Sequence, residues 1–441
     1  MSPKCLVQNH LSCQDCKCRP IRTGVSSLTN SEPKQQIATP SRLLNLLNNL
    51  LTSVHHHYDN LLPGVDALLA MFGAMALRDR TKPLSLMFEA PSGAGKSAIV
   101  QMAFPLPDSG LHAYVYRSDK FTPRAFVSHA ANVQKDELAK MDLLPKLEGK
   151  VLITKEMAPL FRGRVEELQD TFSILIAVLD GKGLLSDTGM RGQRGYDRSI
   201  IFNWIGATTP LPPATHRLMS QLGTRLLFFE MPPFEVSDED LLRYAEDGDP
   251  GLAESECKEA MNELLVGFFA EFPVGSVNPK SISLPQPLLT QLIRWAKFLA
   301  RCRAEVKFEK DNGRDWVPVA VSPPEAPFKI VTYFKDLALG RALIYGRETV
   351  DESDIDLVGE VAISSVPGHF RPIVRALRLG EVRTERASKV CAVSAPTARN
   401  YMAELALLGI AELTKGNAAS NQADSLVLAA PYKWLLKDLE G

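Results

Sequence analysis

The sequence predicts a mixed α/β protein of several domains, built around a parallel sheet. Three observations support this fold class. Short apolar runs alternate with helical segments between residues 83 and 234, which is typical of a parallel α/β sheet. A Gly-rich segment at 90–97 follows the first of these runs and precedes a helical pattern. From residue 238 to residue 366 strand patterns largely vanish and helical periodicity dominates.

Length and composition limit the number of domains and the kinds of partner that we expect. A chain of 441 residues fits about two or three domains. Apolar residues make up 45% and charged residues 23%, the balance of a soluble protein with a large core. The 50 Lys and Arg nearly cancel the 51 Asp and Glu, so nucleic-acid binding must come from local patches. Because no apolar run approaches the ~20 residues that span a bilayer, we expect a cytoplasmic protein without membrane contact.

Residues 1–40 are expected to form a Cys-containing tail and a linker. The possible metal ligands in this tail are Cys5, His10, Cys13, Cys16 and Cys18. A tetrahedral zinc site needs four ligands, and the four cysteines would be the thiols that form it. The usual Cys-x-x-Cys pairs separated by a loop are absent, and Cys16 and Cys18 are closely spaced for two ligands of one ion. We therefore favour a reduced tail over the alternative, a zinc site.

Residues 41–236 are predicted to form the α/β domain. Two helical patterns come first, one starting at Ser41 and one at 65–77. The predicted strands of the parallel sheet are the apolar runs at 85–88, 112–116, 151–154, 200–205 and 225–229.

The loop between the first strand and the next helical pattern matches a phosphate-binding motif. Its residues are Ala90, Pro91, Ser92, Gly93, Ala94, Gly95, Lys96 and Ser97. The glycines allow backbone N–H groups to turn inward onto phosphates, Lys96 would neutralise β and γ oxygens, and Ser97 would ligate Mg²⁺. Ala90 stands where the motif usually begins with Gly. We therefore predict that Pro91 to Ser97 bind ATP and Mg²⁺.

Hydrolysis of ATP needs a carboxylate at the end of a neighbouring strand, where it orients the attacking water. Glu156, just after the strand at 151–154, is the only acid in that place and is our candidate. Lys155 stands where the Mg²⁺-associated Asp is expected, which weakens the prediction of catalysis. The alternative is that Glu156 is only an acidic residue near the start of the following helix.

These features resemble an AAA+ ATPase, more closely the pre-sensor-1 hairpin branch that includes the minichromosome-maintenance helicases. The resemblance covers about residue 61 to the C-terminus. It implies a P-loop nucleotide domain at 41–236, a helical lid at 237–366 and a winged helix-turn-helix at 367–441. We expect the polar, Pro-rich stretch at 308–327 to be a loop inserted in the lid. The family assembles as rings or partial rings with ATP sites shared between subunits, so we expect a homo-oligomer.

The resemblance also implies roles for further residues. Thr208 or Thr209 matches the polar sensor of the γ-phosphate. Arg225 matches the arginine that reaches ATP held by the neighbouring subunit, which would make hydrolysis depend on oligomerisation; the alternative is an ordinary surface cation. Lys329 occupies the place of the second sensor, normally Arg, although Arg341 and Arg347 compete for that role.

One region implied to contact DNA is the segment at 183–196. Its β-prone flanks and central glycines predict a hairpin. In the resembled branch, a hairpin here projects into a central channel and carries basic residues to nucleic-acid phosphates. Arg191 and Arg194 would be those residues. The alternative is a solvated turn with ordinary surface charge.

The C-terminal segment predicts a second DNA contact. Helices are expected at 370–378, 385–390 and 395–407, followed by a wing of strands at 410–413 and 425–428. Ser394 would cap the third helix. Thr397, Arg399 and Asn400 begin that helix, where a recognition helix contacts bases or phosphates. Winged helices also bind proteins, so partner proteins are the alternative.

The sequence therefore predicts an ATP-binding and ATP-hydrolysing protein that oligomerises and acts on DNA as a helicase-like or remodelling motor. One alternative is an ATP-controlled regulatory or scaffolding switch with little turnover, which Lys155 favours. Another is a MoxR-like chaperone that remodels protein.

Overall fold

The computed structural model describes residues 41–128, 133–188, 192–212, 215, 223, 225–232, 237–247, 250–311, 315–416 and 423–436. The tail cysteines Cys5, Cys13, Cys16 and Cys18 lie outside these residues, as does Arg191. In the described part of the chain, no helix is long and apolar enough to cross a membrane.

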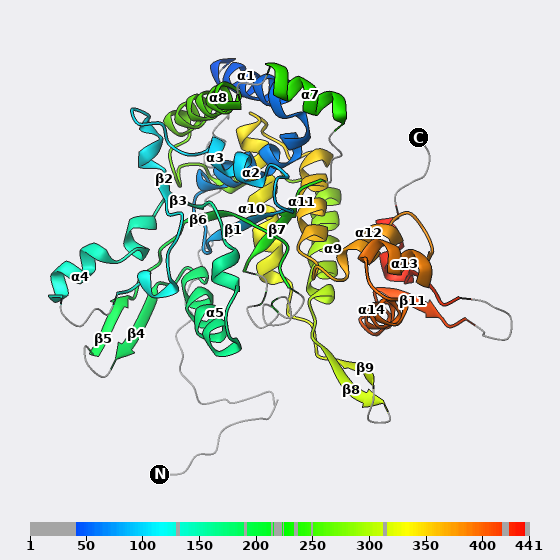
Figure 1. Cartoon of the computed structure of the whole chain (residues 1–441). Coiled ribbons are helices and arrows are strands. Elements are labelled where there is room, and N and C mark those ends of the chain that lie inside the picture. Colours follow the sequence, from blue (N-terminus) through cyan, green and yellow to red (C-terminus); the bar gives the residue numbers. More distant parts are fainter. Residues whose placement is uncertain are drawn as a thin grey trace, which may run out of the picture. The chain divides into compact units, whose positions relative to one another are not determined.

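A five-stranded parallel sheet lies at the centre of the described chain (Figure 1). Its strands, in the order β2-β3-β6-β1-β7, are β2 (Val115–Arg117), β3 (Val151–Thr154), β6 (Asn203–Thr208), β1 (Leu84–Glu89) and β7 (Leu227–Glu230). Every residue of β1, β3 and β6 is buried, as expected for a parallel sheet covered on both faces. The α/β class and the five-stranded sheet are confirmed, but the strand predicted at 112–116 begins only at Val115, because Gly110–Ala113 form a 3-10 helix.

Alternate residues of each strand face opposite sides of the sheet. On one side, Leu86 and Phe88 of β1 join a hydrophobic cluster that contains α2 (Leu62–Met75), α10 (Phe328–Ile344) and α11 (Glu352–Ser364). On the other side, Met87 joins a second cluster with α5 (Val165–Leu179). The sheet therefore separates two apolar cores.

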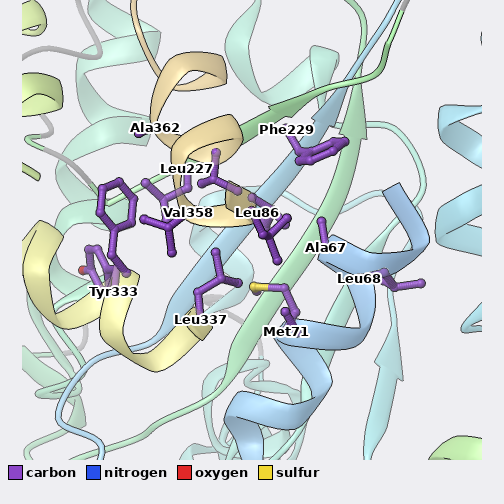
Figure 2. Close-up of a cluster of buried hydrophobic side chains, with 14 of the residues drawn as sticks. Ala67, Leu68, Met71, Leu86, Leu227, Phe229, Tyr333, Leu337, Val358 and Ala362 are labelled. Carbon is purple, nitrogen blue, oxygen red and sulfur yellow. The ribbon is translucent and has the colours of Figure 1, made fainter. Parts of the chain in front are cut away.

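Helices of the segment expected to form the lid lie directly against the sheet. Figure 2 shows Leu337 of α10 and Val358 of α11 beside Leu86 and Leu227 of the sheet and Met71 of α2. The other helices of this segment are α7 (Asp238–Asp247), α8 (Pro250–Glu271) and α9 (Gln286–Cys302). Since α10, α11 and the sheet share one core, the boundary between nucleotide domain and lid stays a prediction.

Two glycines allow α2 and α10 to approach closely. A Cβ atom added at Gly73 would lie 2.0 Å from the Gly340 carbonyl oxygen, and one at Gly340 would lie 2.4 Å from the Ala74 nitrogen. Both neighbours are backbone atoms, so they cannot move aside as a side chain would. The crossing of α2 and α10 therefore requires glycine on both helices.

The structure corrects the expected loop at 308–327. Strands β8 (Val306–Asp311) and β9 (Asp315–Val321) form an antiparallel hairpin across much of it. Pro318 and the charged residues hid this strand pattern. Pro318 lies opposite Phe308, next to a break in the register between Lys307 and Phe308, and such irregularities tolerate a residue that lacks an N–H donor.

The predicted C-terminal elements are confirmed. Three helices, α12 (Arg371–Leu377), α13 (Thr384–Cys391) and α14 (Ala395–Leu407), precede strands β11 (Ala411–Thr414) and β12 (Ser425–Leu428). A short strand that was not predicted, β10 (Val382–Arg383), pairs with β12. Ser394 caps α14, because its Oγ accepts a hydrogen bond from the Thr397 N–H at 3.4 Å. The identification of these elements as a winged helix-turn-helix stays a prediction.

Two further predictions of local structure are also confirmed. Helices α1 (Ser41–Tyr58) and α2 precede β1. Strands β4 (Leu184–Thr188) and β5 (Gly192–Tyr196) pair in antiparallel fashion, which is the hairpin predicted at 183–196.

Candidate nucleotide site

The predicted phosphate loop connects β1 to α3 (Lys96–Met102). Gly93 and Gly95 have φ angles of 85° and 77°, which residues with side chains rarely adopt. A Cβ atom at Gly95 would also lie 2.5 Å from Cδ2 of Leu61. Alternating glycines of this kind turn successive N–H groups towards one point, which creates a concave site for anions.

Lys96 lies across this loop. It is 6% exposed, and its Nζ donates a hydrogen bond to the Pro91 carbonyl oxygen at 3.3 Å. A buried ammonium group that is held by a neutral carbonyl is poorly compensated. The position of Lys96 therefore suits a bound anion such as a phosphate.

Strand β6 brings the sensor candidates beside the loop, because it lies between β1 and β3. The Ala90 N–H donates to the Thr208 carbonyl oxygen at 3.2 Å. Thr208 is fully buried and its hydroxyl donates to the Thr209 carbonyl at 2.9 Å. Thr209 is only partly buried, and its Oγ1 accepts a hydrogen bond from Arg162 Nη2 at 3.3 Å. Of the two candidates, Thr209 has the hydroxyl that can reach a ligand.

Glu156 follows β3 at the same edge of the sheet. It is half-buried, and its Oε1 accepts the Ala158 N–H at 3.0 Å. This hydrogen bond agrees with the alternative that Glu156 is only an acidic residue near the start of the following helix. The second oxygen of its carboxylate could still bind a water molecule. Glu156 and Arg162 also line a pocket of about 210 Å³, together with Lys120 and Thr154. The arrangement can therefore hold a water molecule between an acid and a cation.

Lys155, which replaces the expected Asp, is exposed. The pKa of the nearby Asp119 carboxyl lies below its usual value, chiefly because Arg117 donates hydrogen bonds to it, with a smaller contribution from Lys155. The charge of Lys155 therefore acts at this edge of the sheet. Among the described residues, no group of three or more His, Cys, Asp or Glu side chains could hold a metal ion. Binding of Mg²⁺ through Ser97 and the phosphates of a nucleotide, a common arrangement for this ion, stays a prediction.

Arg225 and Lys329 meet at Asp180, away from this loop. Arg225 Nη2 lies 3.1 and 3.0 Å from the two Asp180 carboxylate oxygens, and Lys329 Nζ lies 3.0 Å from Oδ1. Burial raises the pKa of Asp180, but hydrogen bonds from Arg225 and Lys329 outweigh it, so the pKa lies below its usual value. Arg225 precedes β7, whereas the loop follows the parallel strand β1. The two sites therefore lie at opposite ends of the strands.

The competing arginines Arg341 and Arg347 are held elsewhere. Both donate hydrogen bonds to Asp354, at 2.8 and 2.7 Å, and Arg341 also binds Asp66. These two arginines therefore belong to an ion-pair cluster that joins α10, α11 and α2.

Arg194 is not displayed on the β4–β5 hairpin as the sequence suggested. It is 7% exposed, its Nη2 lies 3.0 Å from Asp142 Oδ2, and Nη1 binds the Ser128 carbonyl. The Tyr196 hydroxyl donates to the same Asp142 oxygen at 2.9 Å. This buried pairing favours a structural role for Arg194. Its contact with nucleic acid stays a prediction, and Arg191 lies outside the described residues.

The three candidates at the start of α14 differ in their surroundings. Thr397 shares a hydrogen bond with Ser394, and Asn400 Nδ2 donates to the Trp316 carbonyl of β9 at 3.4 Å. Arg399 has a 57% exposed side chain, with its Nε 3.4 Å from Asp424. Arg399 is therefore an accessible cation at the start of α14.

Sequence reasoning missed Arg162 and Asp180. Both become visible only through contacts between residues far apart in the chain, 47 and 45 positions respectively. No local motif in the sequence marks either of them.

No protein-family model matches this chain, and no curated protein matches it. Its function must therefore be inferred from the site itself.

Proposed function

We propose that this chain is an AAA+ ATPase that binds and hydrolyses Mg²⁺-bound ATP at the loop between β1 and α3. The observation that carries the proposal is the buried Lys96 lying across a loop whose Gly93 and Gly95 have positive φ angles. Lys96 would contact the β and γ phosphates and Ser97 the metal ion. Thr209, Glu156 and Arg162 lie at the same edge and would orient water beside the γ-phosphate.

We further propose that the active form is a homo-oligomer. Arg225 and Lys329 lie one strand length from the loop of their own chain, which is about 13–20 Å for strands of this size. The Lys329 side chain is 36% exposed and would be accessible to a nucleotide held by a second copy, whereas Arg225 is buried against Asp180 and would first have to leave that carboxylate. An arginine that approaches from outside stabilises charge on the transferring phosphoryl group. Hydrolysis would then require a neighbouring subunit.

DNA is the proposed substrate, contacted by Arg399 and its neighbours at the start of α14. A specific observation favours the switch as a second candidate: Lys155 places a positive charge where a metal-associated carboxylate is expected. With that carboxylate missing, ATP binding would persist while turnover would be slow. The chaperone alternative predicts turnover that responds to protein and not to DNA.

Steady-state ATPase activity, measured against protein concentration with and without DNA, separates these functions. The motor predicts specific activity that rises with concentration and with DNA, and that falls in Arg225→Ala. Arg294→Ala, an exposed arginine on α9, is the matched control and should behave as the wild type. Tight ATP binding with negligible turnover at every concentration would favour the switch. Turnover that is flat with concentration and unchanged in Arg225→Ala would contradict the shared site.

A further inference from the structure

A chain of ion pairs, buried at its inner end and partly exposed further out, connects the phosphate loop to the C-terminal helices. Glu89 is the last residue of β1 and immediately precedes the loop. Its Oε2 accepts a hydrogen bond from Arg371 Nη1 at 2.5 Å, and its Oε1 accepts one from the Leu211 N–H at 3.1 Å. Arg371 is the first residue of α12. One carboxylate thus joins the loop strand, the segment that follows Thr208, and α12.

The ion pairs continue outward along α12. Arg371 also lies 3.2 Å from Glu230 at the end of β7, and Glu230 lies 3.0 Å from Arg375. Arg375 pairs with Glu360 of α11 at 3.0 Å, and Glu360 pairs with Arg378 at 3.3 Å. The three arginines are spaced by four and three residues, so they lie on one face of the helical segment. We call this set, from Glu89 to Arg378, the α12 ion-pair chain.

The innermost ion pair of this chain, between Glu89 and Arg371, is buried, so each side chain relies on the other to compensate its charge. The side chains of Glu89 and Arg371 are 3% and 4% exposed, so solvent cannot replace either partner. Arg371 Nε has no hydrogen-bond partner among the described residues, and its Nη2 donates to the Val366 carbonyl at 3.4 Å. Since an unpaired buried charge is costly, a movement of Glu89 must carry Arg371 with it.

The path from α12 to the C-terminal helices is short. Helix α12 ends at Leu377, and β10 and α13 follow within a few residues. At the outer end, Arg378 Nε donates to the Leu435 carbonyl at 3.4 Å. A displacement of α12 would therefore reach both the helices and the last described segment.

We propose that Arg371 is a positioning residue for the phosphate loop, and that the α12 ion-pair chain transmits the state of the nucleotide site to α13 and α14. This rests on the proposed ATP site. A triphosphate in the loop changes the charge and the backbone contacts at the end of β1, where Glu89 is held. Arg371 acts through Glu89 and does not touch the nucleotide. Through this connection, ATP would alter the surface that carries Arg399.

Hydrogen exchange of the full-length protein, with and without Mg²⁺-bound ATP, tests the transmission without needing DNA. In the wild type, ATP should slow exchange both in the loop and in α12–α14. Arg371→Lys keeps the charge but loses the planar guanidinium group. It should weaken ATP binding by about tenfold, which is a typical coupling between sites. It should also abolish the effect of ATP on hydrogen exchange in α12–α14. Arg375→Gln changes a half-exposed member of the chain. It should bind ATP normally and lose only the remote response.

Arg386→Lys, on the exposed side of α13, is the matched control and should respond as the wild type does. If Arg371→Lys does not fold, Arg375→Gln decides the question. Wild-type responses in both chain variants would overturn the proposal, and so would loss of the response in Arg386→Lys. Calorimetry of the wild type separates the two levels. Absence of ATP binding refutes the ATP site itself, whereas binding without a response in α12–α14 refutes only the transmission.

Discussion

Replacing Gly73 with Ala should destabilise the protein through the crossing of α2 and α10. The new Cβ atom would lie 2.0 Å from the Gly340 carbonyl oxygen, where ordinary van der Waals contact begins at 3.4 Å. Because the obstacle is backbone, the two helices must separate by about 1.4 Å to reach ordinary contact, which forfeits part of the packing between them. This matters for function because α2 leads into β1 and the phosphate loop.

The magnitude follows from two opposing terms. Overpacking against rigid backbone costs roughly 3–5 kcal/mol, at or above the upper end of measured small-to-large substitutions. Ala is a better helix former than Gly by about 1 kcal/mol, which acts in the opposite direction. The cost of overpacking is the larger of the two terms, so we expect a net loss of roughly 2–4 kcal/mol in the free energy of unfolding.

Urea unfolding followed by far-ultraviolet circular dichroism measures this loss. Gly110→Ala is the control, because a Cβ there would lie 3.8 Å from Val266, at ordinary contact distance. It should change the free energy of unfolding by less than about 1 kcal/mol. A Gly73→Ala protein as stable as the Gly110→Ala protein would refute the close packing.

Three further predictions concern the site residues. Arg194→Gln leaves the buried Asp142 carboxylate without its cation, so the free energy of unfolding should fall by about 3–5 kcal/mol. The affinity for DNA should not change. Normal stability together with weakened DNA binding would instead assign Arg194 to a phosphate contact. The folded pKa of Asp180 lies below the usual 3.8, so its contribution to stability is present above about pH 4 and is lost as pH falls through the folded pKa. The difference in unfolding free energy between wild type and Asp180→Asn should therefore shrink on acidification, and parallel stability curves would contradict this. Thr209→Val should lower the turnover of ATP without changing the stability of the protein. Thr208→Val should lower the stability, because it removes a buried hydrogen-bonded hydroxyl. The reverse pattern would make Thr208 the sensor.

The sheet and the loop were predictable because their signals are local. Each strand of the sheet is a short apolar run, and the phosphate loop is a contiguous motif that ends at Ser97. The capped start of α14 at Ser394 is equally local. Such patterns depend on neighbours a few residues away, and these neighbours can be read directly from the sequence.

The remaining features depend on contacts that sequence patterns do not encode. The burial of Arg194 depends on Asp142, 52 residues earlier, and the pairing of Arg371 with Glu89 spans 282 residues. A charged side chain in a sequence is usually exposed, so both arginines look like surface cations. The β8–β9 hairpin was missed for a different reason: Pro318 argues against a strand unless an irregularity in the register accommodates it.

The most direct test of the account is isothermal titration calorimetry of Mg²⁺-bound ATP into the wild type and into Lys96→Ala. The account predicts saturable binding in the wild type. It predicts a loss of at least about tenfold in affinity in Lys96→Ala, because one charge-assisted contact of about 1.5–3 kcal/mol to the phosphates is removed. Circular dichroism of both proteins should be the same. Equal affinity in the two proteins, or no binding by a folded wild type, would contradict the assignment of a nucleotide site to this loop.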